Sequence, residues 1–166
     1  YVCITRPRRF GKTVMANMLG AFLTKSAATK KLFAQLNIGR DAEAMQHINQ
    51  YNVIYIDFSR ISSNDYQSYI DNIAEVLKND LHKAYPDVDY RAAGGVAEDL
   101  ERITAATGER FIFIFDEWDA IFHAAFISED DRKKYLLFFK DLLKDRVDVQ
   151  LAYMTGVLPI STYTSS

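Results

Sequence analysis

The run Phe111–Phe115 (FIFIF) constrains the fold more than any other segment, and it leads directly into Asp116 and Glu117. Five successive apolar residues leave no polar face for water. The run therefore predicts a strand buried on both faces, as in a parallel sheet covered by helices. The two carboxylates that follow it would lie at the carboxyl edge of the sheet, where open α/β sheets bind their ligands.

Strands and helices are predicted to alternate along the rest of the chain. The predicted strands are Tyr1–Thr5, Val53–Phe58, Phe111–Phe115 and Val147–Thr155. The predicted helices are Lys12–Thr24, with Val14, Met18, Ala21 and Phe22 on one apolar face, then Lys30–Leu36, Asp41–Asn49, Asp65–Ala84, Val96–Ala106 and Asp130–Lys144. This alternation implies right-handed crossovers and a doubly wound α/β sandwich.

Length and composition fit a single globular domain of 166 residues with a net charge of −2. A near-neutral balance is not the charge of a general nucleic-acid binder. One cysteine cannot form an internal disulfide, and no CxxC or Cys/His cluster is present, so a cytoplasmic location is expected. The longest purely apolar runs have five residues, too short to span a bilayer. The chain begins without Met and ends in the polar tail Ser161–Ser166, which we interpret as the sign of a fragment.

The string Arg6–Thr13 (RPRRFGKT) stands between a predicted strand and a predicted helix. It is close to the P-loop, or Walker A, pattern G-x-x-x-x-G-K-[ST], with Arg6 in place of the first glycine. In that pattern Gly11 lets the backbone approach phosphate oxygens. Lys12 contacts the β- and γ-phosphates, and the Thr13 hydroxyl ligates Mg²⁺.

Other residues of the same loop modify this prediction. Pro7 removes one N–H donor, whereas Arg8 and Arg9 add positive charge where a triphosphate would lie. Together with Phe10, these arginines complete the predicted nucleotide-binding segment. The loop considered alone is equally consistent with an ordinary basic turn before a helix.

The acidic pair after the buried strand decides between these interpretations, because it has the Walker B form. Asp116 would hold Mg²⁺, usually through water, and Glu117 would orient and deprotonate the attacking water. A GTPase would show D-x-x-G after its second strand and N-K-x-D for guanine, and neither string occurs. The two motifs together predict a site for ATP.

The strings RPRRFGKT, VIYIDFS, FIFIFDEWD and MTGV resemble the AAA-ATPase-like domain family over nearly the whole chain, 1–166. The resemblance implies an additional-strand P-loop ATPase sheet, with Val147–Thr155 inserted between the P-loop strand and the Walker B strand. It also implies that Thr155 acts as a polar sensor near the γ-phosphate. The chain stops before the last strand of that sheet, the arginine finger and the second sensor. Many members carry a C-terminal PD-(D/E)xK nuclease-like domain, whose E-x-K triplet is absent here.

Three further residues near these motifs have two interpretations each. Asp57 is either a neighbour of the site or a hydrogen-bonded turn acid. Asp119 either orients Lys12 or a water, or caps a helix, and Trp118 is interpreted as a packing residue.

The sequence therefore favours an Mg²⁺-dependent ATPase domain that acts as a motor or switch for an attached effector. One alternative is a nucleotide-sensing scaffold with little or no hydrolysis, and another is a kinase-like phosphotransferase, for which no acceptor-binding motif is visible. The expected partners are ATP, a fused or associated nuclease-like domain and further copies of the chain. No membrane partner is expected, and nucleic acid only through other domains.

Overall fold

Four parallel strands form one sheet in the computed structural model, which describes residues 1–157. They are β1 (Val2–Thr5), β2 (Asn52–Asp57), β3 (Phe111–Asp116) and β4 (Val149–Gly156), in the spatial order β1-β4-β3-β2. The sequence predicts that Val147–Thr155 lies between the strand before the loop Arg6–Thr13 and the strand before Asp116. The position of β4 between β1 and β3 confirms this. The predicted tail at 161–166 lies outside the described residues.

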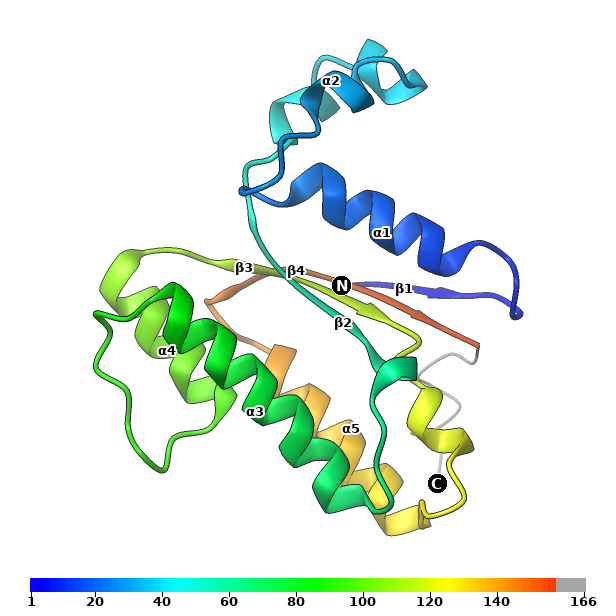
Figure 1. Cartoon of the computed structure of the whole chain (residues 1–166), viewed down its shortest axis with the longest axis vertical. Coiled ribbons are helices and arrows are strands. Elements are labelled where there is room, and N and C mark those ends of the chain that lie inside the picture. Colours follow the sequence, from blue (N-terminus) through cyan, green and yellow to red (C-terminus); the bar gives the residue numbers. More distant parts are fainter. Residues whose placement is uncertain (158–166) are drawn as a thin grey trace.

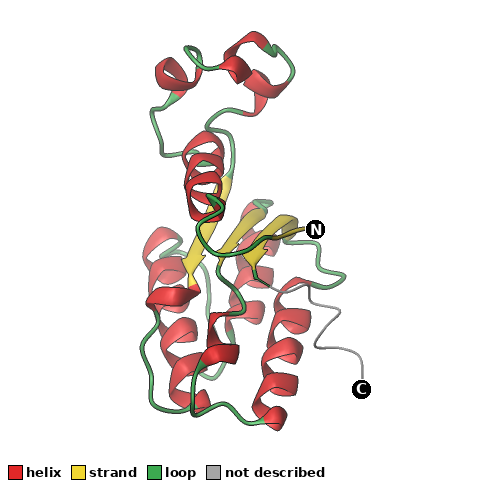
Figure 2. Cartoon of the chain, turned by 90° about the vertical axis from the view of Figure 1, so that its right-hand side faces the viewer, coloured by secondary structure: helices red, strands yellow, loops and turns green. Residues whose placement is uncertain are grey.

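Helices cover both faces of this sheet, as Figures 1 and 2 show. Helix α1 (Lys12–Leu23) lies on one face, and α3 (Tyr66–Ala84), α4 (Val96–Thr107) and α5 (Glu129–Leu143) lie on the other. None of the helices within residues 1–157 is long and apolar enough to cross a membrane.

Strand β3 is buried along its whole length, as its apolar sequence predicts. Ile112 and Ile114 pack in the core beneath α1. Phe111, Phe113 and Phe115 pack in the larger core with α3, α4 and α5. Because successive side chains of a strand alternate between faces, this strand supplies both hydrophobic cores, which confirms the α/β class.

The segment between α1 and β2 differs from its prediction. It forms an arm at the top of Figure 1, made of α2 (Lys30–Phe33), η1 (Asn37–Arg40) and η2 (Ala44–His47). The helix predicted over 41–49 is wrong. The Asp41 carboxylate accepts hydrogen bonds from the amides of Glu43 and Ala44, both at 3.0 Å, and only the short η2 follows. Local bonding by a short acidic side chain competes with regular helix.

The face through which helix α1 packs on the sheet agrees only in part with the prediction, since Phe22 is buried and Ala21 packs against the same core. Val14 and Met18 are 60% and 40% exposed, whereas the buried positions include Ala16 and Gly20. A Cβ at Gly20 would lie 3.5 Å from the Tyr55 ring, so small residues permit close approach of the helix to the sheet.

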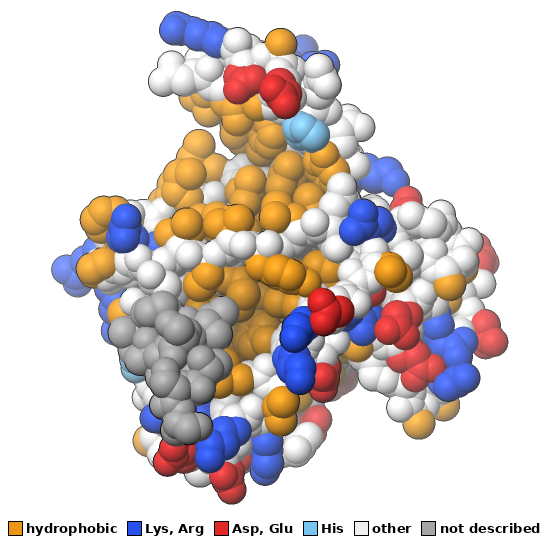
Figure 3. Space-filling model, turned by 180° about the vertical axis from the view of Figure 1, so that it is seen from behind, with side chains coloured by type: hydrophobic (Ala, Val, Ile, Leu, Met, Phe, Trp, Pro, Cys, Tyr) orange, Lys and Arg blue, Asp and Glu red, His pale blue; other side chains and the backbone are white. Residues whose placement is uncertain are grey.

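Figure 3 faces the β1 edge and shows hydrophobic side chains gathered on that side of the molecule.

The close approach of Gly156 to the loop after β3 gives a stability prediction. A Cβ at Gly156 would lie 2.6 Å from Trp118 Nε1, and the Trp118 side chain is fully buried. We expect Gly156→Ala to lower the free energy of unfolding by about 1–3 kcal/mol, because the core cannot yield without strain. Urea denaturation measures this, with Gly95→Ala as the control, since a Cβ there meets nothing within 4 Å. Equal stability of the two variants would contradict the packing described.

Candidate functional site

The carboxyl ends of the strands meet at one edge of the sheet, and α1 begins at the same edge, at the right of Figure 1. The register pairs Thr5 with Gly156, and Asp57 with Asp116. Thr155 directly precedes Gly156 and contacts Asp116. The predicted position of Asp116 and Glu117, at the carboxyl edge of the sheet, is confirmed.

The loop between β1 and α1 leads into the start of α1, whose first backbone N–H groups have no partner within residues 1–157. Gly11 (φ 82°) and Arg9 (φ 66°) adopt left-handed conformations, which turn the chain sharply into the helix. No side chain of the described residues 1–157 caps helix α1, and its first turn contains no acidic residue. Helices α3 and α5, by contrast, are capped by Asp65 and Ser128. The start of α1 thus retains the free donors and the dipole that favour an anion.

The Lys12 side chain lies inside this loop and is only 7% exposed. Its ammonium donates hydrogen bonds to the carbonyl oxygens of Arg6 at 2.8 Å and Pro7 at 3.0 Å. A buried ammonium held by neutral carbonyls has not found its strongest acceptors, since charged oxygens bind it more tightly. A phosphate at the start of α1 would offer such acceptors.

The remaining residues of the loop are exposed around the helix start. Thr13 is exposed in the first turn of α1. Arg8 and Arg9 make no ion pair with any residue in the range 1–157, and the Arg6 guanidinium lies 5.7 Å from the centre of the Phe10 ring. The loop is therefore a positively charged surface around the N–H groups of α1.

Asp116 ends β3 and is fully buried. Its Oδ1 accepts a hydrogen bond from the Thr155 hydroxyl, while Oδ2 accepts no hydrogen bond of normal geometry from residues 1–157. The charge of this carboxylate affects the pKa values of two nearby tyrosines. Burial first, and then the charge of Asp116, raises the pKa of Tyr55 to about 12, and the same two causes raise the pKa of Tyr153.

The Oδ2 oxygen of Asp116 has no hydrogen-bond partner within residues 1–157, although the nearby Tyr55 hydroxyl also interacts with this carboxylate. A cation would satisfy this buried oxygen, whose burial without a partner is costly. No group of three or more His, Cys, Asp or Glu side chains within the described part of the chain is arranged to hold a metal. Asp116 and the exposed Thr13 suit Mg²⁺ instead, because this ion takes few protein ligands and completes its shell with water and phosphate.

Glu117 follows in a strained conformation, with φ at 52°, and is partly exposed. A left-handed conformation costs a residue other than glycine about 1–2 kcal/mol. Two bonds to β4 hold it: the Glu117 amide donates to the Thr155 hydroxyl oxygen at 3.1 Å, and the Trp118 amide donates to the Thr155 carbonyl at 3.0 Å. The strained backbone at Glu117 is therefore maintained by its bonds to β4, a type of strain that is common at functional sites.

Thr155 thus connects the two acidic residues. Its hydroxyl has one proton, which goes to Asp116, and its oxygen accepts from the Glu117 amide. In this arrangement Thr155 holds the carboxylate of Asp116 and the backbone of Glu117. The predicted contact of Thr155 with the γ-phosphate stays a prediction.

The structure gives two of the three neighbouring candidates the expected local role. Trp118 is buried and its carbonyl accepts from the Tyr135 hydroxyl at 2.7 Å, which confirms packing. Asp57 accepts from the Ser59 amide at 3.1 Å, which confirms the turn.

Asp119 is the residue before η4 (Ala120–His123), but its side chain makes no cap hydrogen bond to that helix, so the cap interpretation is wrong. Its carboxylate accepts from the Val157 amide at 2.7 Å. The alternative, that Asp119 orients Lys12 or a water, stays a prediction.

Sequence reasoning missed the surroundings of Asp116, namely Tyr55 on β2 and Tyr153 on β4. Both pair with Ile114, two residues before Asp116, and share its face of the sheet. The alternation of side chains along each strand can be read from the sequence. The register between the strands, which brings these tyrosines to Asp116, cannot.

Comparison with known proteins identifies the class to which this fold and site belong. A family described as predicted AAA-ATPase matches residues 1–164. The chain belongs to this AAA-ATPase-like family, as the motifs in its sequence predict. No curated protein and no solved structure matches the chain.

Proposed function

We propose that this domain binds ATP with Mg²⁺ at the carboxyl edge of its sheet and hydrolyses the bond between the β- and γ-phosphates. The observation that carries the proposal is the placement of Lys12, with the free amides of α1, at the same sheet edge as Asp116 and Glu117. Phosphate binding and water activation need these two groups on either side of one substrate. Membership of a family of predicted ATPases supports the same activity.

Each part of the site has a role in this proposal. The amides at Gly11–Thr13, with Arg8, Arg9 and Phe10 around them, would hold the triphosphate, and the Lys12 ammonium would exchange two carbonyls for phosphate oxygens. Thr13 and Asp116 would hold Mg²⁺, which supplies charge neutralisation on the phosphates. The Glu117 carboxylate would accept the proton of the attacking water, and the products would be ADP and phosphate.

The position of β4 supports the assignment to the additional-strand class of P-loop ATPases, since β4 separates the P-loop strand from the strand of the acidic pair. It brings Thr155 to the carboxylate of Asp116 and to the backbone amide of Glu117. We propose that changes in the occupancy of the site pass through this contact to an attached effector, such as a nuclease-like domain, or to another copy of the chain. We also propose that an arginine finger from outside this chain completes the site for hydrolysis.

A nucleotide-sensing module with little hydrolysis is the second candidate. It is favoured by the arrangement of Lys12, whose ammonium is already bound to Arg6 and Pro7, and by the commitment of the Thr155 proton to Asp116. A site in which these two side chains are already hydrogen-bonded within the protein would bind ATP as a signal without turning it over rapidly. The glutamate at position 117 is not needed by such a module, and this favours the enzyme.

Nucleotide preference tests the proposal before any turnover is measured. We expect Mg²⁺-dependent binding of ATP that is at least about tenfold tighter than binding of GTP, because the guanine-reading string N-K-x-D is absent and a good bidentate contact to a base discriminates by roughly 1–3 kcal/mol. Isothermal titration calorimetry of each nucleotide, with Mg²⁺ and with EDTA, measures this. Equal affinity for both nucleotides would contradict the adenine assignment.

A further inference from the structure

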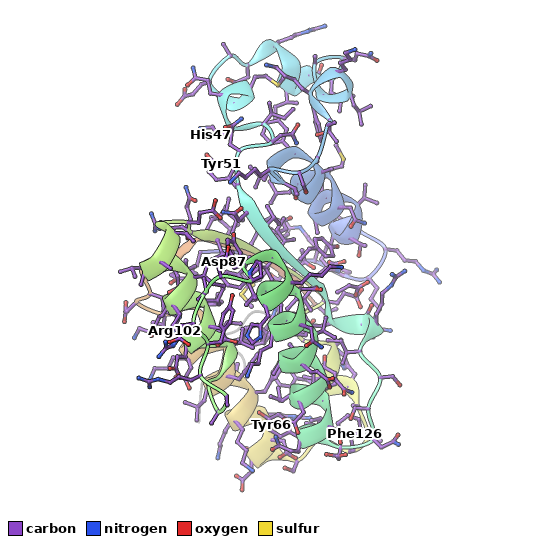
Figure 4. The ribbon with its side chains drawn as sticks, turned by 60° about the vertical axis from the view of Figure 1, so that its left-hand side comes forward. His47, Tyr51, Tyr66, Asp87, Arg102 and Phe126 are labelled. Atoms are coloured by element: carbon purple, nitrogen blue, oxygen red, sulfur yellow. The ribbon has the colours of Figure 1, made fainter. Side chains whose placement is uncertain are left out.

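A groove of about 870 Å³ runs along the outer edge of β2, from the start of the strand to Asp57 at its carboxyl end. Its floor is β2 itself, one wall is α3, and the other wall is the turn that follows α1. The outer edge of β2 faces the viewer in Figure 1. In Figure 4, Tyr51 marks the end of the groove where β2 begins, and Tyr66 marks the start of α3 near the opposite end.

The floor of the groove is an unpaired strand edge. β2 is the last strand of the sheet and pairs only with β3 among the described strands. The turn after α1 covers just its start, through a bridge between Thr24 and Tyr51. The outward main-chain groups of residues 53–57 have no partner within the part of the chain that the structure describes. Such an edge is a template for another strand.

The two walls differ in polarity. The α3 wall is apolar, with Ile73 and Leu77 buried at its base and Val76 61% exposed on its rim. The opposite wall is polar and consists of Thr24, Lys25 and Ser26. Since side chains alternate along a strand, a segment that fills this groove needs apolar residues toward α3 and polar ones toward the turn.

Some of the charged side chains that line the groove form ion pairs, and one does not. Lys25 pairs with Glu109 at 2.8 Å, and Arg60 pairs with Asp57 at 3.4 Å. Asp80, on the α3 wall, is exposed and pairs with no cation in the range 1–157. A basic residue in the occupant would complement this carboxylate.

We propose that the groove binds an extended segment of a partner protein, which adds a strand to the free edge of β2. The segment alternates apolar and polar residues and places a lysine or arginine beside Asp80. A second copy of β2 does not fit, because the same two walls that flank this edge also flank the edge of the copy. A single extended segment matches both the six-residue strand and the walls, in the manner of other peptides that bind by strand addition.

A fluorescein-labelled peptide in which valine and threonine alternate between two terminal lysines tests this on the full chain. Fluorescence anisotropy should show saturable binding to the wild type, and a version with proline at its centre should not bind. Val76→Glu places a charge on the α3 wall and should weaken binding by at least about tenfold. Val147→Glu changes another exposed valine, which does not line the groove; it is the matched control and should bind as the wild type does.

Asp80→Asn tests the charge complementarity separately. It should weaken the lysine peptide about two- to fivefold, the range of an exposed ion pair, and leave a peptide with glutamines at both ends unaffected. The absence of saturable binding, or equal binding by Val76→Glu and Val147→Glu, would overturn the proposal. A dimer of the chain that Val76→Glu dissociates in sedimentation experiments would also overturn it, because a second copy would then be the occupant.

Discussion

Glu117→Gln is expected to lower ATP turnover by about a hundredfold or more while leaving ATP affinity almost unchanged. Glutamine keeps the size of glutamate and its place in the strained turn, where the Glu117 amide bonds to Thr155. It cannot accept the proton of the attacking water, and a general base contributes roughly 10²–10⁴-fold to a rate. Phosphate release and calorimetric titration of ATP, carried out side by side, measure the two quantities.

The matched control is Glu75→Gln, the same change on the exposed surface of α3. It should leave both turnover and affinity at the values of the wild type. Equal turnover by Glu117→Gln and Glu75→Gln would show that Glu117 is not the base.

Lys12→Ala is expected to weaken ATP binding by at least about tenfold and to abolish turnover. The Lys12 ammonium would contact phosphate in both the bound substrate and the transition state, so its loss affects binding and chemistry together. In the free protein the change also removes the donor to the carbonyls of Arg6 and Pro7. Calorimetric titration of ATP and phosphate release measure the effect, and thermal unfolding shows whether the fold is retained.

Lys133→Ala removes a lysine from the exposed surface of α5 and serves as the control for the loss of one positive charge. Its ATP affinity should equal that of the wild type. If Lys12→Ala bound ATP as tightly as Lys133→Ala does, the triphosphate would lie elsewhere.

The parts of the fold that the sequence predicts are those with strong local signals. The run FIFIF can be satisfied only by a strand buried on both faces, and the structure places it in the centre of both cores. Glycine before Lys12 and Thr13 predicts a sharp turn into a helix, and Gly11 has the required positive φ. These motifs also place the candidate site, because parallel strands bring their carboxyl ends to one edge.

The features that the sequence does not predict depend on contacts between distant segments. The buried face of α1 follows Gly20, where the Tyr55 ring approaches the helix, rather than the most apolar positions such as Val14. The bond between Thr155 and Asp116 joins residues far apart in the chain, and it depends on a register that no local pattern encodes. The arm between α1 and β2 is likewise set by side-chain bonds, such as those of the Asp41 carboxylate, that compete with helix formation.

Release of phosphate from ATP by the wild-type chain tests the central claim most directly. The measurement is made with Mg²⁺ and with EDTA, and the Lys12→Ala variant is measured beside the wild type. It is repeated in the presence of a nuclease-like domain, the effector proposed above. The proposed ATPase predicts Mg²⁺-dependent release above the rate of the variant. Tight binding of ATP without release above that background, under every one of these conditions, would contradict hydrolysis and leave a nucleotide-sensing module.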